Sequence, residues 1–234
     1  INDIVVGTLA SSLAVLTSRQ KELGAVVVNI GASITGVAVF EEGEVLHLAI
    51  VPIGSEHITN DLAIGLRTSI EVAERIKRQV GSAVPDAVNK REEIDLKEFG
   101  ASSSEIISKR FIADVIHARV EEIFEKVALE LKKIKRDGML PAGVILTGGG
   151  AKLTGIADAA KRTLRLPAAE GTVLGIVGAE GEAFDPTFST AVGLVKWGME
   201  IVMENGNESS FFSKIVNFGK ISGSIKKLLK GMLP

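Results

Sequence analysis

The chain has 234 residues, of which 46% are hydrophobic and 25 are glycine, a composition typical of a globular α/β protein. The absence of cysteine excludes disulfide bonds and thiolate metal sites. A formal net charge of −2 argues against bulk nucleic-acid binding, so no nucleic-acid partner is expected. No apolar run reaches the length of a membrane-spanning helix, and we recognise no signal peptide. Because residue 1 is Ile1 rather than Met, we expect a fragment or a processed chain.

The N-terminal part predicts one helix followed by a β-meander. Apolar residues at helical spacing predict a helix over residues 3–16. Three apolar runs separated by turns then predict strands over residues 25–30, 36–41 and 45–51. The runs Val26-Val27-Val28 and Val37-Ala38-Val39-Phe40 are apolar without alternation, which is typical of a sheet covered on both faces. We therefore expect the α/β fold class.

Two helices and a polar loop are expected next. The pattern predicts helices over residues 58–66 and 70–80, and Thr68-Ser69-Ile70-Glu71 has the form of a capping box that opens the second. Residues 82–100 have neither a helical nor an alternating period. They are expected to form a loop with at most a short strand near residues 93–96.

A long helix and three shorter elements complete the body. Ser102-Ser103-Ser104-Glu105 has the form of a second capping box, and an apolar stripe predicts that the helix it opens runs to about Arg136. Pro186 suits the first turn of a last helix that ends near Met203. Between these helices we expect a buried strand over residues 144–147 and a helix that starts near Thr154.

Two glycine turns at strand ends are the candidate ligand site. They are Asn29-Ile30-Gly31-Ala32-Ser33-Ile34-Thr35-Gly36 and Leu146-Thr147-Gly148-Gly149-Gly150-Ala151. Glycines let the backbone approach a ligand, and a tight turn aims successive amides inward, which makes an anion site. The hydroxyls of Ser33 and Thr35 add donors. Neither turn matches a dinucleotide fingerprint or a Walker loop, and each alone is equally well explained as an ordinary turn of an α/β sheet.

The C-terminal tail differs in charge from the body. Residues 206–234 hold five lysines and one acid, so they sum to +4, and residues 1–205 then sum to −6 (−2 minus +4). Residues 206–210 read as a linker, and residues 211–234 as an amphipathic helix. Its apolar face includes Phe211, Ile215, Phe218, Ile225, Leu228 and Leu229, and its basic residues include Lys226, Lys227 and Lys230. This pattern is typical of a helix that lies in the interface of an anionic membrane, although it also suits a terminal helix packed on the body or a partner.

Several segments resemble the actin-like ATPase superfamily and, within it, the FtsA family of bacterial cell-division proteins. Residues 50–68 are the most specific of these, and residues 73–77, 119–124 and 146–151 are similar to the family as well. The resemblance covers nearly the whole chain. It corresponds to the C-terminal half of that family, namely subdomains 2A and 2B and a membrane-targeting tail.

The resemblance implies an actin-like (ribonuclease H-like) mixed sheet flanked by helices, with an inserted α+β subdomain. Residues 1–67 and 137–205 would form subdomain 2A, and residues 68–136 the inserted subdomain 2B. The resemblance also implies a site for ATP with Mg²⁺. The resemblance implies that the residues on the phosphate side are Asn29, Gly31, Ser33 and Thr35. It implies that the residues lining the adenosine pocket are Glu74, Lys77, Gly148, Gly149 and Gly150. Without the resemblance, Glu74 and Lys77 would be read as an ordinary exposed ion pair.

The phosphate turn departs from the family pattern at two acidic positions. The family has Asp at both ends of this turn, whereas Asn29 and Gly36 stand here. Asn29 has no negative charge with which to hold magnesium-bound water. We therefore assign no catalytic residue and no protein metal site, and we expect at most a weak ATPase.

The family's role implies a cell-division adaptor at the cytoplasmic face of the membrane. It would recruit the ring protein FtsZ through that protein's acidic C-terminal peptide, with Arg110 and Arg119 as anchors, and would self-associate into actin-like filaments. Two alternatives stay open. One is an actin-like pilus-assembly adaptor, and the other is an ATP-hydrolysing kinase or chaperone-type enzyme, for which the turn lacks a catalytic acid.

Overall fold

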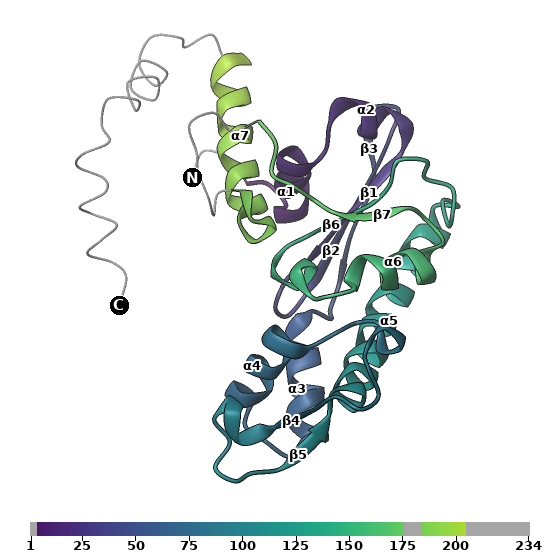
Figure 1. Ribbon diagram of the computed structural model, residues 1–234. Coiled ribbons are helices and arrows are strands. Elements are labelled where there is room, and N and C mark those ends of the chain that lie inside the picture. Colours follow the sequence, from purple (N-terminus) through teal and green to yellow (C-terminus); the bar gives the residue numbers. More distant parts are fainter. Residues whose placement is uncertain (1–3, 176–183, 205–234) are drawn as a thin grey trace, which may run out of the picture.

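A five-stranded mixed sheet forms the centre of the computed structural model, which describes residues 4–175 and 184–204 (Figure 1). The strand order is β3-β2-β1-β6-β7. Neighbours β1, β2 and β3 pair antiparallel, whereas β1, β6 and β7 pair parallel. The strands are β1 (Ala25–Ile30), β2 (Thr35–Glu41), β3 (Glu44–Val51), β6 (Gly143–Thr147) and β7 (Ala168–Glu170). The predicted mixed α/β sheet is confirmed.

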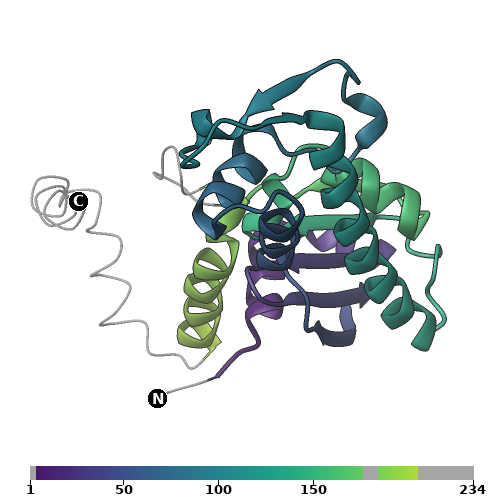
Figure 2. The same ribbon diagram turned by 90° about the horizontal axis from the view of Figure 1, so that it is seen from below.

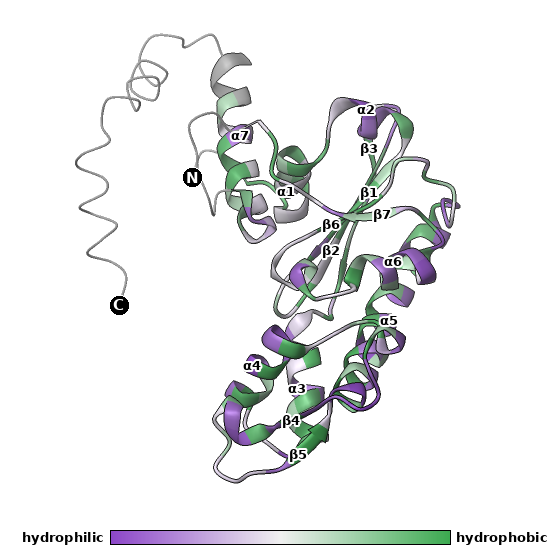
Figure 3. Cartoon of the chain, viewed as in Figure 1, coloured by the Kyte–Doolittle hydropathy of each residue, from purple (hydrophilic) through white to green (hydrophobic). Residues whose placement is uncertain are grey.

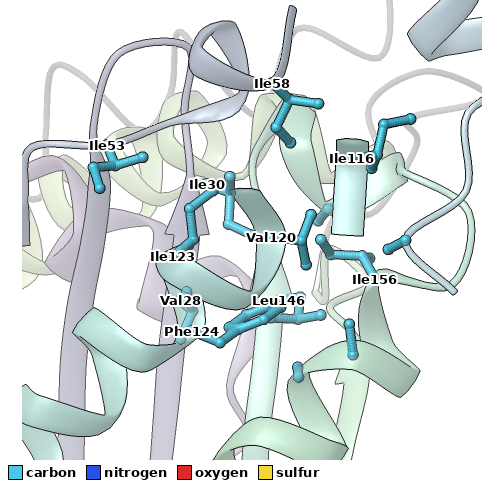
Figure 4. Packing of buried hydrophobic residues seen from close by; sticks show 14 of the residues in the cluster. Val28, Ile30, Ile53, Ile58, Ile116, Val120, Ile123, Phe124, Leu146 and Ile156 are labelled. Atoms are coloured by element: carbon cyan, nitrogen blue, oxygen red, sulfur yellow. The ribbon is translucent and has the colours of Figure 1, made fainter. Parts of the chain in front are cut away.

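Helices cover the two faces of the sheet unequally. On one face, α3 to α6 and the strands bury a large apolar cluster, part of which Figure 4 shows around Phe124, Ile123 and Leu146. On the other face, α1 packs on β1 and β2, and α7 lies beside α1 (Figures 1 and 2). The helices are α1 (Gly7–Val15), α2 (Ser18–Leu23), α3 (Ser55–Gly65), α4 (Ile70–Val80), α5 (Lys109–Lys133), α6 (Ile156–Leu164) and α7 (Ser189–Glu204).

The chain between β3 and β6 builds the end of the molecule that lies away from α2. Here α3, α4 and the small sheet of β4 (Glu93–Asp95) and β5 (Ile106–Ser108) gather around the first half of α5 (Figure 1). Helix α4 is amphipathic, with polar residues outward and Val72, Ala73 and Ile76 buried (Figure 3). One continuous apolar cluster joins this end to the central sheet. The division into subdomains at residues 68 and 136 stays a prediction.

The long central helix begins later than predicted. The second capping box is wrong, because residues 106–108 pair with residues 93–95 as strand β5, and Ser108 caps α5 instead. Asp95 accounts for the difference. Its carboxylate accepts hydrogen bonds from Ser104 Oγ (2.6 Å) and from the backbone N–H of Glu105 (3.2 Å), so these groups are not available to open a helix.

Smaller corrections concern helix starts and two missed elements. Helix α1 begins at Gly7 rather than residue 3, and α4 is capped by Ser69, whose Oγ accepts from the Val72 N–H at 3.3 Å, rather than by Thr68. The last helix starts with a 3₁₀ turn at Pro186–Phe188 before α7. Helix α2 and strand β7 were not predicted, because both are too short to show a period.

The predicted linker and amphipathic tail, residues 206–234, lie outside the described residues. Among the helices that the structure does describe, none combines the length and the apolar character needed to cross a membrane.

Candidate functional site

The two glycine turns meet at one edge of the sheet. Strands β1 and β6 are parallel neighbours, with Asn29 opposite Thr147, so their carboxyl ends lie side by side. Gly148 has a φ of +82°, and a Cβ placed on it would lie 2.4 Å from Asn29 Oδ1 and 2.6 Å from the carbonyl oxygen of Ile30. Only glycine permits this approach. The geometric premise that both turns lie together is therefore confirmed.

The first turn is held against the start of helix α3. The carbonyl oxygen of Gly31 accepts a hydrogen bond from the Ser55 N–H at 2.9 Å, and that of Ala32 accepts from the Glu56 N–H at 2.8 Å. Ser33 is exposed, and its Oγ donates to Glu56 Oε2 at 3.1 Å. Thr35 is fully buried, and its hydroxyl donates to the carbonyl oxygen of Ile53 at 2.7 Å, so it supports the turn from behind.

Asn29 ties the carboxyl end of β1 to the helices on the other face. Its Nδ2 donates to Ser11 Oγ (3.3 Å) on α1 and to Thr190 Oγ1 (3.1 Å) on α7. The amide therefore faces two hydroxyls on one side and Gly148 on the other. A neutral amide suits this position, because it donates and accepts at once.

A pocket of about 430 Å³ opens beside these turns, a volume within the usual range for ligand sites. Of the predicted site residues, Glu74, Lys77, Gly149 and Gly150 line it, whereas Asn29, Gly31, Ser33, Thr35 and Gly148 belong to the adjoining turns. The remaining lining residues were not predicted; they are Ser55, Ile58, Arg78, Lys152, Leu153, Thr154 and Thr187. Arg78 follows Lys77, and Lys152 lies two positions after Gly150. This closeness in sequence to predicted residues was the signal that could have identified both as lining residues.

The pocket wall is net positive. Lys77, Arg78 and Lys152 contribute three positive charges and Glu74 one negative charge, so the lining sums to +2. Gly149 adds open backbone, since a Cβ placed on it would meet no atom within 4 Å. Cationic side chains beside an open glycine backbone favour an anionic ligand.

Lys77 and Glu74 form a hydrogen-bonded group with Thr59 rather than a loose surface pair. Lys77 Nζ donates to Glu74 Oε2 (2.6 Å), to Thr59 Oγ1 (2.7 Å) and to the carbonyl oxygen of Ser55 (3.1 Å), and only 10% of its side chain is exposed. Thr59 Oγ1 in turn donates to Glu74 Oε2 at 2.6 Å. Burial by itself raises the pKa of Glu74, but the hydrogen bonds from Lys77 and Thr59 outweigh it, so that the pKa is lowered overall. These hydrogen bonds thus hold the Glu74 carboxylate in its charged form at the pocket wall.

The second turn also holds the start of the last helix. Thr147 Oγ1 lies 2.7 Å from Ser189 Oγ and 3.1 Å from the carbonyl oxygen of Pro186. Lys152 forms an ion pair with Asp185, whose other oxygen accepts from the Thr187 N–H at 2.9 Å. Contacts between residues 148–152 and the chain that enters α7 therefore close one side of the pocket.

The ion pair between Asp185 and Lys152 makes the stability of this side of the pocket depend on pH. Hydrogen bonds from Lys152 and Thr187 lower the pKa of Asp185 from 3.8 to about 2. Because the folded pKa is depressed, the stabilisation is complete above about pH 4 and is lost as pH falls toward 2. We expect Asp185→Asn to be less stable than the wild type at pH 6, with a difference that shrinks below pH 4. Urea unfolding midpoints across this range measure it, and a difference independent of pH would contradict the assignment.

The two predicted partner-binding arginines are engaged in internal ion pairs. Arg119 binds Asp61 of α3 through two hydrogen bonds of 2.6 and 2.9 Å, which join α5 to α3. It also binds Glu122 of its own helix at 2.5 Å. The hydrogen bonds with Asp61 raise the pKa of Arg119. Arg110 contacts Asp86 at 2.9 Å and the more distant Asp114 at 3.3 Å.

Comparison with known proteins finds one family along most of the chain. A family model described as "Cell division protein FtsA" matches residues 26–193. Cell division protein FtsA of Pseudomonas aeruginosa is 34% identical over 200 residues, covering 86% of this chain and 48% of that protein. The Bacillus subtilis protein of the same name is 34% identical over 213 residues, covering 90% and 47%. The chain spans about half the length of the curated relatives that it matches.

Solved structures share the actin-like fold at low identity. MreB5 of Spiroplasma citri bound to ADP superposes with a TM-score of 0.68 at 19% identity, covering 87% of this chain and 62% of that one. A chain of the structure described as "PilM-PilN type IV pilus biogenesis complex" gives a TM-score of 0.61 at 18% identity, covering 84% of this chain and 53% of that one. At these identities the likeness concerns the fold alone.

Proposed function

Since the chain belongs to the FtsA family of cell division proteins, we propose that it is part of an ATP-binding adaptor that recruits FtsZ and attaches it to the membrane. We place this activity at the cytoplasmic face of the membrane at the division site. In this proposal residues 1–67 and 137–205 form the nucleotide-facing subdomain, and residues 68–136 the inserted one. The observation that carries the proposal is the cationic, glycine-lined pocket where the two turns meet.

ATP fits this pocket in one orientation. The adenosine would lie against Glu74, Lys77 and the Gly149-Gly150 backbone, and the phosphates, with their Mg²⁺, would extend toward Gly31 and Ser33 at the first turn. Support comes from the net charge of the lining and from the fold shared with MreB5 structures, which are described as bound to ADP and to AMPPNP. Because Asn29 is neutral and its amide already bonds to α1 and α7, we propose that nucleotide sets conformation or assembly rather than fuelling rapid turnover.

Membrane attachment is assigned to residues 211–234. Deleting them should abolish co-sedimentation with anionic vesicles, because their apolar face and lysines supply the binding free energy. Replacing Lys226, Lys227 and Lys230 by glutamine should weaken binding on the order of 100-fold, at about 1 kcal/mol for each lysine. Neutral vesicles are the control. Equal binding to anionic and neutral vesicles would show that the lysines contribute no electrostatic binding free energy.

The FtsZ peptide is assigned to the surface between α3 and the first half of α5. Three large apolar side chains are exposed in this region: Ile64 by 77%, Phe111 by 45% and Ile106 by 57%. Phe111 lies against Gly65 of α3. Arg110 precedes Phe111 on α5 and donates to the Pro85 carbonyl oxygen (2.8 Å) and to Asp86 (2.9 Å). The Asp86 side chain is 79% exposed, so a peptide carboxylate can reach it and replace it. Arg119, bound on both sides by carboxylates, would instead hold α3 and α5 in register.

Arg110→Gln should therefore weaken binding of the acidic FtsZ C-terminal peptide by about 10-fold, the size of one charge-assisted hydrogen bond. Fluorescence anisotropy of a labelled peptide measures this effect. Arg91→Gln, which removes a charge from the loop before β4, is the control. Unchanged affinity in the Arg110 variant would remove this assignment.

Self-association into actin-like filaments follows from the same family membership, and sedimentation with and without ATP tests it. The PilM–PilN likeness keeps a pilus-assembly adaptor as the alternative. That likeness concerns the fold at 18% identity, whereas the division relatives are 32–37% identical over most of the chain. A chain that binds vesicles but not the FtsZ peptide would favour the alternative.

A further inference from the structure

Strand β3 presents a row of apolar side chains to solvent on one face. Val45, Leu48 and Ile50 pair with Phe40, Ala38 and Gly36 of β2, and Leu46 stands at the register shift between them. The exposed fractions of Val45, Leu46, Leu48 and Ile50 are 41%, 43%, 38% and 60%. We call these four residues the β3 row.

The β3 row lies on the same sheet face as α1 but beyond its edge. Helix α1 covers Val27, Ala38 and Phe40, and its Thr8 sits directly on Gly36 of β2. On the opposite face, β3 is covered, since Val51 and Ala49 join the main core and His47 contacts Glu130 of α5. A strand that is apolar on both faces is typical of a sheet covered on both faces, so the row has the composition of a covered surface.

An acidic cluster borders the β3 row at the β2–β3 hairpin. Glu42 and Glu44 flank the turn, and Glu22 Oε2 lies 3.3 Å from where a Cβ on Gly43 would stand. Two cations lie near this hairpin, namely Lys21, 5.4 Å from the Phe40 ring, and Arg136, which binds Glu41. With Glu22, Glu41, Glu42 and Glu44 these groups sum to −2 (−4 plus +2). A ligand that is apolar along one side and basic at its border complements this surface.

The chain itself carries such a segment, and it leaves from the same side. Helix α7 packs against α1, so the 30 residues after Glu204 (234 minus 204) start on the sheet face that bears the β3 row. Helix α1, which α7 contacts, itself contacts β2, the strand next to β3. The linker 206–210 adds up to about 17 Å of reach at ~3.3 Å per residue. Both the side of the sheet and the length of the segment therefore favour docking of residues 211–234 on the row.

We propose that the amphipathic segment 211–234 docks on the β3 row when no membrane is present, with its apolar face on Val45, Leu46, Leu48 and Ile50 and its lysines toward Glu22, Glu42 and Glu44. The same apolar face cannot lie on β3 and in lipid at once. Docking therefore competes with membrane attachment, and it covers the apolar face of residues 211–234 until they bind an anionic membrane. The competition rests on the proposed membrane function, whereas the docking itself does not.

Cross-linking tests the docking directly, because the chain contains no cysteine. The double variant Ile50→Cys with Phe218→Cys, treated with a short bismaleimide, should give an intramolecular product of monomer mass, and anionic vesicles should suppress it. Ile70→Cys with Phe218→Cys is the control, since Ile70 is also exposed but lies on α4. A product found only as a dimer would assign the row to a second copy of the chain and overturn the proposal. Absence of any product above the control would overturn it as well.

Vesicle binding tests the competition. The double variant Leu48→Asp, Ile50→Asp should lower the lipid concentration for half-maximal co-sedimentation by about 10-fold, because the tail no longer has its intramolecular site. The double variant Ile70→Asp, Leu129→Asp is the matched control, because it adds the same two charges at exposed apolar positions of α4 and α5. If the chain with the intact row does not bind vesicles but cross-links internally, membrane attachment fails and docking stands. If it binds vesicles and the row variant binds no better than the control, the competition is refuted while membrane attachment stands.

Discussion

Replacing Gly148 by alanine is expected to lower the free energy of unfolding by about 2–4 kcal/mol. Gly148 has φ +82° and ψ 173°, a region that is essentially restricted to glycine. The added Cβ would also stand 2.4 Å from Asn29 Oδ1 and 2.6 Å from the carbonyl oxygen of Ile30. A backbone carbonyl in a central strand cannot move aside as a flexible side chain would.

Gly149 provides the matched control one residue away. Alanine there would meet no atom within 4 Å, so Gly149→Ala should keep the stability of the wild type while altering the pocket wall. Denaturant unfolding of the two variants, with the slope m checked for constancy, measures the difference. Equal stability of the two variants would contradict the close approach of β1 and β6 on which the site depends.

Replacing Lys77 by glutamine should weaken ATP binding by about 10- to 100-fold. Lys77 supplies one of three positive charges in the pocket lining. Its three ammonium donors already bind Glu74 Oε2, Thr59 Oγ1 and the Ser55 carbonyl oxygen, so it acts on the ligand through its charge and by holding this part of the pocket wall in place. Charge-assisted hydrogen bonds of this kind are worth about 1.5–3 kcal/mol, and the glutamine variant would lose them. Isothermal titration with ATP gives the affinity.

Arg75→Gln is the control for charge alone. Arg75 is on the same helix but its Nε bonds to the carbonyl oxygen of Glu71, and its guanidinium lies against Gly100, away from the pocket. A loss of affinity confined to the Lys77 variant supports a role of Lys77 at the pocket wall. Similar losses in both variants would show a general electrostatic effect, and no loss in either would remove the nucleotide from this pocket.

The sheet was predictable because its strands are continuous apolar runs. Residues 25–30 match β1, and the predicted second and third strands differ from β2 and β3 by one residue each. Helix α4 was likewise predicted with its bounds, because its apolar residues keep a clear helical period. Where the start of a helix depended on a cap, as at Ser102 and Thr68, the prediction failed. A serine or threonine can bond to any nearby backbone or carboxylate group, and only the fold decides which.

The site was predictable in part. Glycines at strand ends and the resemblance of residues 73–77 located Glu74, Lys77, Gly149 and Gly150, which do share a pocket, but whether they bind nucleotide stays a prediction. Lys152 and Thr187 were missed, because the Lys152–Asp185 pair joins residues 33 positions apart in sequence. The partner assignment of Arg110 and Arg119 took no account of Asp86 and Asp61, which lie 24 and 58 positions away from them.

The sequence by itself determined the class of fold, the strands and the glycine turns, because these follow from local spacing of apolar residues and from backbone freedom at single positions. Only the tertiary structure decided which groups face one another. It placed Asn29 against Gly148, buried the Thr35 hydroxyl, grouped Thr59 with Lys77, and left one face of β3 open. The physical reason is that hydrogen bonds, ion pairs and burial depend on neighbours across the fold, and those neighbours leave no periodic mark in the sequence.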